Sequence, residues 1–225
     1  MEDVKDTVEC GKILVAHAPT GIGKTVAALV PTLHYAMEHE KTVFFLTSKR
    51  SQHKIAIDTL RLMKKRAKLE FLAVDVTSKQ AMCPRAVSLY QDFYSLFNEF
   101  CRSEQKSKRC HYFMKHDEEA LRRIEKEILH VEELCRWCAT RGVCPYKAAF
   151  EVAENADVLV CDYNYLFSAD IAETVLERIK KGLDDLIIIV DEAHNLPDRI
   201  RSNISSELPM CSFVTIITFF PRTSQ

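Results

Sequence analysis

The chain has 225 residues, of which 47% are hydrophobic and 28% charged, and it contains only 5 glycines and 7 prolines. This composition excludes disordered and fibrous proteins and is typical of a folded globular protein. The formal net charge of −1 excludes an overall basic field, so any contact with nucleic acid must be local.

The first third of the chain predicts strands that alternate with helices. Residues 12–18 form a short apolar run typical of a strand, and apolar side chains recur at helical spacing over residues 24–37. Residues 42–46 are rich in β-branched and aromatic side chains, which favours a buried strand. A second helix is predicted over residues 55–63, and a third strand over residues 71–76.

The same alternation returns in the last third. Residues 146–154 and 171–179 predict helices, whereas residues 158–161 and 186–190 predict strands. Strands that alternate with helices are joined by right-handed crossovers, which place the strands in a parallel sheet covered on both faces. The sequence therefore predicts an α/β fold.

The middle of the chain breaks this rhythm. Residues 82–145 hold a cluster of cysteines and a charged amphipathic segment at residues 118–134. We interpret this part as a small domain inserted into an α/β domain made of residues 1–81 and 146–203. Residues 204–225 form a tail of uncertain structure.

A phosphate-binding loop is predicted between the first strand and the first helix. Residues 18–25 fit the P-loop pattern, with alanine in place of the usual first glycine. Two glycines let consecutive N–H groups point at phosphate oxygens, and the following helix adds its positive end. The lysine would reach the β- and γ-phosphates of ATP, and the threonine hydroxyl would bind Mg²⁺. The predicted ATP-binding residues are Pro19, Thr20, Gly21, Ile22, Gly23, Lys24 and Thr25.

Two acidic residues follow the last predicted strand. Asp191 and Glu192 come directly after residues 186–190, at the strand end where open α/β sheets bind ligands. Asp191 would hold Mg²⁺, and Glu192 would polarise the water that attacks the γ-phosphate. His194 could sense that phosphate. We predict Lys24, Asp191, Glu192 and His194 as the catalytic residues.

Cysteine is unusually frequent in this chain. Six of the 9 cysteines lie between Cys83 and Cys144, and clustered thiolates hold zinc or an iron–sulfur cluster. Spacing alone favours Cys135 and Cys138 with Cys144, and ligand type does not decide between zinc and iron. The apolar runs are too short to cross a membrane and the polar start is no signal peptide, so we expect a cytoplasmic protein.

Five segments carry a resemblance to a known family. The runs HAPTGIGKT, FLTSKRSQHKIAIDTLR, GVCPYKAAFE, ADVLVCDYNYLF and DEAHNL resemble, in this order, the first motor domain of the XPD group of superfamily 2 helicases. Archaeal members resemble it most, and the DinG helicases are more distant. The resemblance covers residues 12–196. It implies a RecA-like fold, ATP-driven 5′-to-3′ translocation on single-stranded DNA, and a 4Fe–4S cluster domain inserted before the DEAH strand.

The resemblance also implies which residues bind the cluster and DNA. Cys135 and Cys138 depart from the family pattern. The implied cluster ligands are Cys83, Cys101, Cys110 and Cys144. The residues that match the family's DNA-contacting motif Ia are Thr47, Lys49, Arg50 and Gln52, and the alternative is a solvated loop. The basic run at residues 64–68 is more typical of a solvated helix end than of a DNA site.

The resemblance finally implies a second RecA-like domain, which supplies an arginine to the transition state. We expect no second RecA-like domain within these 225 residues. A truncated reading frame, a shifted reading frame and an artificial boundary of the chain are the alternative explanations. This chain alone should therefore bind ATP weakly and not unwind DNA. DNA-repair proteins are further expected partners. A different P-loop ATPase, and a nucleotide- or metal-binding interaction module without enzymatic activity, are the alternative functions.

Overall fold

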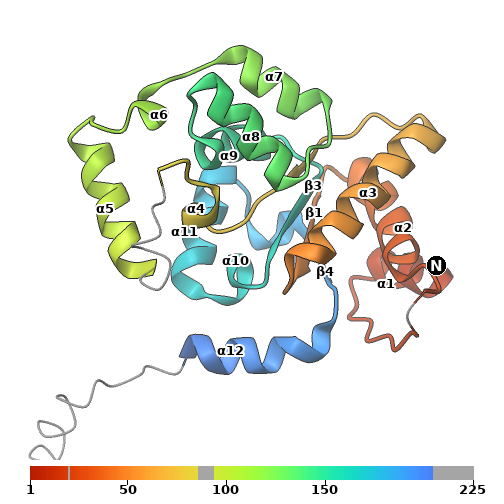
Figure 1. Cartoon of the computed structure of the whole chain (residues 1–225). Coiled ribbons are helices and arrows are strands. Elements are labelled where there is room, and N and C mark those ends of the chain that lie inside the picture. The colour runs from red at the N-terminus through yellow and green to blue at the C-terminus, as the bar shows by residue number, and fades with distance from the viewer. Residues whose placement is uncertain (20, 86–93, 205–225) are drawn as a thin grey trace, which may run out of the picture.

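A computed structural model describes residues 1–19, 21–85 and 94–204. Within these residues, four strands form one parallel sheet in the order β2-β3-β1-β4. Figure 1 labels three of them, β1, β3 and β4. The strands are β1 (Thr42–Thr47), β2 (Ala73–Asp75), β3 (Val158–Asp162) and β4 (Leu186–Val190). The predicted α/β fold with a parallel sheet is confirmed.

The strands are joined by helices, and the four helices predicted at residues 24–37, 55–63, 146–154 and 171–179 are all present. Two are longer than predicted, because the helix expected at residues 55–63 extends in both directions and the one at residues 171–179 begins earlier. The helices are α1 (Glu2–Glu9), α2 (Lys24–Glu38), α3 (Arg50–Ala67), α4 (Lys79–Met82), α5 (Tyr94–Lys106), α6 (His111–Met114), α7 (Glu118–Lys126), α8 (Val131–Arg141), α9 (Pro145–Ala153), α10 (Asn164–Phe167), α11 (Ala169–Ile179) and α12 (Leu196–Ile204).

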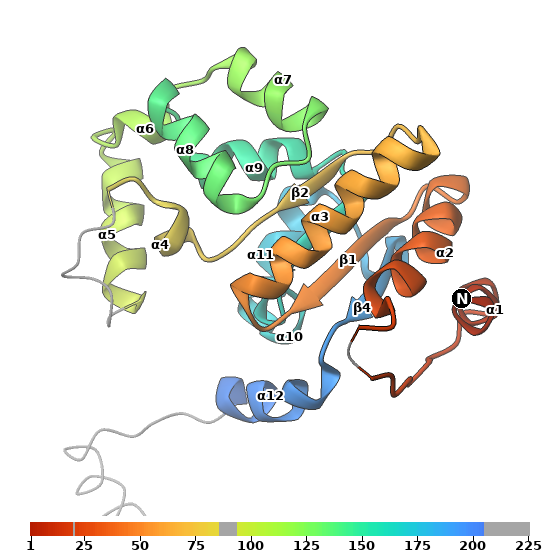
Figure 2. The same ribbon diagram turned by 45° about the vertical axis from the view of Figure 1, so that its right-hand side comes forward.

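Helices cover both faces of the sheet (Figure 2). Val43 and Phe45 of β1 belong to one hydrophobic cluster with α2 and α3. Phe44 and Leu46 of the same strand belong to a second cluster with α7, α8, α9 and α11. This division follows because successive side chains of a strand point to opposite faces. No described helix combines the length and apolar character needed to cross a bilayer.

The segment predicted as an insertion shares the core of the sheet. Ile124 of α7 and Leu134 of α8 are 1% and 0% exposed and lie in the same cluster as Phe44. Fully burying such side chains contributes roughly 1.5–3 kcal/mol each. The helices α7 and α8 are therefore fixed to one face of the sheet. The boundaries predicted for an inserted domain stay a prediction, and residues 205–225 of the predicted tail lie outside the described residues.

The strand predicted at residues 12–18 is not formed. These residues have no regular secondary structure, and Ile13 and Val15 are 93% and 92% exposed. A strand needs a neighbour for its backbone groups, and the described pairings of β4 are with β1 alone. The apolar pattern of residues 12–18 therefore predicted a strand, but no neighbouring strand is present among the described residues to pair with it.

The amphipathic segment at residues 118–134 is not one continuous helix. It divides into α7 and α8, because His130 caps the start of α8. The Glu133 carboxylate accepts the N–H of His130 at 2.8 Å, and the carbonyl oxygen of Ile128 accepts a hydrogen bond from Arg61 at 2.7 Å. These bonds take up backbone groups that a continuous helix would pair internally.

Candidate nucleotide site and cysteine cluster

The predicted phosphate loop leads into the start of α2. Gly21 and Gly23 have φ angles of +85° and +82°, in the left-handed region that favours glycine. Gly23 is the N-cap residue of α2, so the first N–H groups of this helix have no partner within the helix and form its positive end. Pro19 and Ile22 are exposed, whereas Thr20 lies outside the described residues.

The acidic turn after β4 is held by its neighbours. The N–H of Asp191 donates to the carbonyl oxygen of Leu46 in β1 at 2.9 Å, which extends the parallel ladder past the end of β4. The Tyr163 hydroxyl donates to the carbonyl oxygen of Asp191 and, at 3.0 Å, to that of Glu192. Glu192 has a φ of 51°, a conformation that costs a residue with a side chain about 1–3 kcal/mol. The Tyr163 contacts help to hold it.

The two predicted segments meet through Lys24 and Glu192, which are 168 positions apart in the chain. The Lys24 Nζ donates to the Glu192 Oε1 at 3.1 Å, and the His194 Nδ1 lies 3.3 Å from Glu192 Oε2. Thr25, the second residue of α2, is half-buried beside Lys24. The predicted phosphate loop and acidic turn therefore lie side by side at the carboxyl edge of the sheet.

The surroundings shift the pKa values of the two carboxyl groups in opposite directions. The hydrogen bond from Lys24 holds the pKa of Glu192 below its ordinary value. Burial raises the pKa of Asp191, and the neighbouring Glu192 charge raises it further. A cation beside Asp191 would favour its charged form. Glu192 is thus kept ionised by the protein itself, whereas Asp191 gains most from a bound cation.

Four cysteines line one small cavity, and they are the set that the resemblance implied: Cys83, Cys101, Cys110 and Cys144. The same cavity is lined by Lys79, Lys147 and Arg178, whose positive charges suit a site that collects thiolates. Burial raises the pKa of Cys144 to about 11, so this thiol is protonated at neutral pH unless a metal takes the proton's place.

Cys135 and Cys138, the alternatives favoured by spacing, do not line this cavity. The Cys138 side chain is 0% exposed within the hydrophobic core, and the Cys135 Sγ lies 3.8 Å from the carbonyl oxygen of Met82. Within the described ranges, no three Cys, His, Asp or Glu side chains form a group close enough to hold a metal ion. Residues 86–93, between two of the proposed ligands, lie outside those ranges.

The residues predicted to contact DNA follow β1 but differ in exposure. Lys49 and Arg50 are exposed at the start of α3. Thr47 is 0% exposed, and its hydroxyl donates to the side-chain oxygen of Gln52. Lys49 and Arg50 are therefore accessible to a phosphate backbone. Thr47 and Gln52 instead form a hydrogen bond with each other and fix the loop between β1 and α3.

One buried polar network was not predicted. Asp75, at the end of β2, is 0% exposed. Its Oδ1 lies 2.6 Å from the His53 Nδ1, and its Oδ2 accepts the N–H of Val131 at 2.8 Å. The network joins α3, β2 and α8. A single aspartate at the end of a predicted strand gives no sequence signal for these partners, which come from distant parts of the chain.

Comparisons with known proteins place the chain in one family. The DEAD_2 family model matches residues 45–212. The chain is 26% identical to the Saccharomyces cerevisiae general transcription and DNA repair factor IIH helicase subunit XPD/RAD3, over 92% of this chain and 29% of the relative. It is 28% identical to the ATP-dependent DNA helicase DinG of Escherichia coli strain K12, over 88% of this chain and 31% of that relative.

Solved structures agree with the sequence comparisons on the fold. A structure described as truncated XPD superposes with a TM-score of 0.60 at 20% identity, covering 96% of this chain and 58% of the other. An XPD helicase structure gives a TM-score of 0.59 at 22% identity, covering 89% and 32%. The chain therefore has their fold and spans only about a third of the length of the curated relatives.

Proposed function

Because the chain belongs to the DEAD_2 family, we propose that it is the ATP-binding motor domain of a DNA helicase that moves 5′ to 3′ on single-stranded DNA. The contact between the Lys24 Nζ and the Glu192 Oε1, at 3.1 Å, supports this most directly. It joins the lysine of a phosphate loop to the carboxylate of an acidic turn. The relatives described above carry the words DNA helicase or helicase subunit in their names, which favours this function over an unrelated P-loop ATPase.

Each residue of the site has a proposed role in ATP hydrolysis. Lys24 binds the β- and γ-phosphates, so ATP competes with Glu192 for its ammonium group. Glu192, once released, polarises the attacking water. Thr25 and Asp191 hold Mg²⁺, which neutralises negative charge on the phosphates. His194 senses the γ-phosphate through its contact with Glu192.

Nucleotide binding can be tested by thermal unfolding with Mg²⁺ and a non-hydrolysable ATP analogue. A ligand at 100 times its Kd stabilises the folded state by about 2.7 kcal/mol. Wild-type protein should gain thermal stability, and Lys24→Ala should lose that gain. The control is Lys54→Ala, since Lys54 is exposed on α3 and belongs to neither the phosphate loop nor the acidic turn. No stabilisation of the wild type at millimolar analogue would overturn the proposed nucleotide site.

We further propose that Cys83, Cys101, Cys110 and Cys144 bind a 4Fe–4S cluster, which stiffens the segment of residues 82–145. Their common cavity and its cations support this set. Anaerobically purified protein should show the visible absorption of the cluster, and Cys→Ser substitution at each of the four should remove it. Cys138→Ser should keep it. A colourless protein that contains one bound zinc ion would overturn the iron–sulfur assignment in favour of a zinc site. Loss of colour in Cys138→Ser would overturn the ligand set.

Complete helicase activity is proposed to need a second RecA-like domain as partner, because it supplies an arginine to the transition state, often worth about 10³-fold or more in rate. Lys49 and Arg50 are the proposed contacts to the DNA backbone, and DNA-repair proteins are proposed as partners of the whole enzyme. This chain alone should not unwind a duplex with a single-stranded tail. Robust unwinding by the purified 225-residue chain would refute this part of the proposal.

A further inference from the structure

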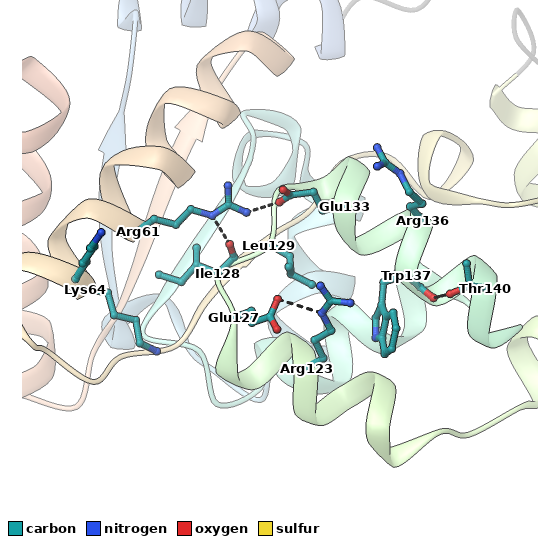
Figure 3. Close-up of a pocket in the computed structure, with 11 residues that line it drawn as sticks. Arg61, Lys64, Arg123, Glu127, Ile128, Leu129, Glu133, Arg136, Trp137 and Thr140 are labelled. Carbon is teal, nitrogen blue, oxygen red and sulfur yellow. Dashed lines mark hydrogen bonds and ion pairs between the residues drawn. The ribbon is translucent and has the colours of Figure 1, made fainter.

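A groove of about 800 Å³ separates α3 from the α7–α8 hairpin (Figure 3). None of the residues that line it belongs to the phosphate loop, the acidic turn or the cysteine cavity. Its α3 side is formed by Arg61, Lys64 and Lys65, which follow Arg50 by 11 to 15 residues. At 1.5 Å per residue they lie roughly 16–23 Å further along the helix than the proposed DNA contacts.

The groove carries a positive charge that the protein does not neutralise. Five cationic side chains line it, against two carboxylates. Both carboxylates are already paired, Glu133 with Arg61 and Glu127 with Arg123 at 3.0 Å. Lys65 and Arg136, by contrast, are exposed and have no ion pair among the described residues. One free cation therefore lies on α3 and another on α8.

Trp137 lies at the hairpin side of the groove, and its ring is occupied (Figure 3). The guanidinium groups of Arg123 and Arg141 lie over the ring, 4.5 and 5.5 Å from its centroid. A base of single-stranded nucleic acid would have to displace them to stack there. The indole N–H is buried without a hydrogen-bond partner in the described part of the chain.

We propose that this groove binds an acidic peptide segment of a partner protein. Carboxylates can pair with Arg136 in a bidentate manner and with Lys65 as a point charge. A peptide can also lie beside Glu127 and Glu133, because its backbone N–H groups can donate hydrogen bonds to these carboxylates. The phosphate backbone of a nucleic acid carries only acceptors and would be repelled by them. Charge complementarity of this kind fixes register and speeds encounter between proteins.

The experiment uses the chain's single tryptophan as its reporter. A peptide of eight alternating Asp and Glu residues is added to the full chain, and Trp137 fluorescence is followed at low and at physiological salt. The peptide should change the fluorescence and should bind more weakly as salt rises. The comparison ligand is oligothymidylate of the same net charge, which carries phosphates but no carboxylates.

The matched variants separate the groove from general attraction to a positive protein. Lys65→Glu combined with Arg136→Glu should weaken peptide binding by about tenfold or more, the effect expected when interface charges that bind a partner are reversed. Lys12→Glu combined with Lys54→Glu reverses two exposed charges outside the groove and should weaken peptide binding by less than about twofold. Circular dichroism checks that both double variants are folded. The proposal is overturned if the groove double variant binds like the wild type, if the peptide leaves Trp137 fluorescence unchanged, or if oligothymidylate binds the groove more tightly than the peptide.

Discussion

The buried network around Asp75 gives a sharp test of what holds the two sides of this fold together. We consider Asp75→Asn, which keeps the size of the side chain and removes its charge. The aspartate accepts two hydrogen bonds, one with the His53 Nδ1 at 2.6 Å and one from the N–H of Val131 at 2.8 Å. An asparagine has one oxygen and an NH₂ group. Its NH₂ group can bond to the His53 Nδ1 only if that nitrogen gives up its proton, so the variant must either oppose two donors or change the His53 tautomer.

The expected cost follows from burial. Asp75 and His53 are 0% and 2% exposed, so water cannot replace the lost acceptor. A buried donor left without a partner costs about 1–3 kcal/mol. Since domains are stable by about 5–15 kcal/mol, this cost is a large share of the total.

Urea unfolding of the wild type and Asp75→Asn measures this difference in the free energy of unfolding. The control is Asp198→Asn, because Asp198 is 85% exposed and its surface pair with Arg201 should change stability by less than about 0.5 kcal/mol. A double-mutant cycle with His53→Ala should show coupling of at least about 0.5 kcal/mol. If Asp75→Asn unfolds like the control, the network does not join α3 to α8 energetically.

Three further predictions concern the site and the hairpin. The stability difference between wild type and Lys24→Ala should be greatest above pH 4.5, the ordinary pKa of Glu192, and should vanish as pH falls through the lowered pKa and Glu192 loses its charge; a difference that grows in acid contradicts the ion pair. Tyr163→Phe should lower the free energy of unfolding by about 1 kcal/mol and weaken nucleotide-dependent stabilisation, because the acidic turn loses its donor; unchanged values in both assays contradict this role. Gly142→Ala should lower the free energy of unfolding by about 1 kcal/mol in urea, because Gly142 ends α8 with a φ of 65°; a more stable variant would exclude strain at this position.

Sequence patterns predicted the edge strand β4 and the two central strands to within one residue, and for the central strands the reason is burial on both faces. Residues 42–46 and 158–161 lie in the two central strands, β1 and β3, where every position meets apolar side chains or another strand. Such strands read as continuous apolar runs, so local pattern and tertiary environment agree. The juxtaposition of the phosphate loop and the acidic turn was also predicted, but from a strand at residues 12–18 that is not formed. It is instead α2, packed against β1, that carries Lys24 to Glu192.

Features that depend on partners distant in sequence were not predictable in the same way. Residues 118–134 carry an unbroken apolar stripe, and only the bond from Arg61 and the cap at His130 explain why two helices form. Similarly, the basic run at residues 64–68 suggested only a solvated helix end. Residues 65–68 are indeed exposed. That Lys64 and Lys65 also line a groove was not predictable, because the hairpin that forms its other side lies about sixty residues further along the chain.

The exposed run before the phosphate loop bears on how the proposed nucleotide site would work. Residues 12–18 form no strand, so within the described residues the clearest link between the loop and the sheet is the contact of Lys24 with Glu192. ATP must break that contact to bind Lys24. This cost lowers the apparent affinity in proportion to the fraction of molecules in which Lys24 is already free of Glu192. An interaction that paired residues 12–18 with a neighbouring strand should therefore strengthen ATP binding without touching the nucleotide.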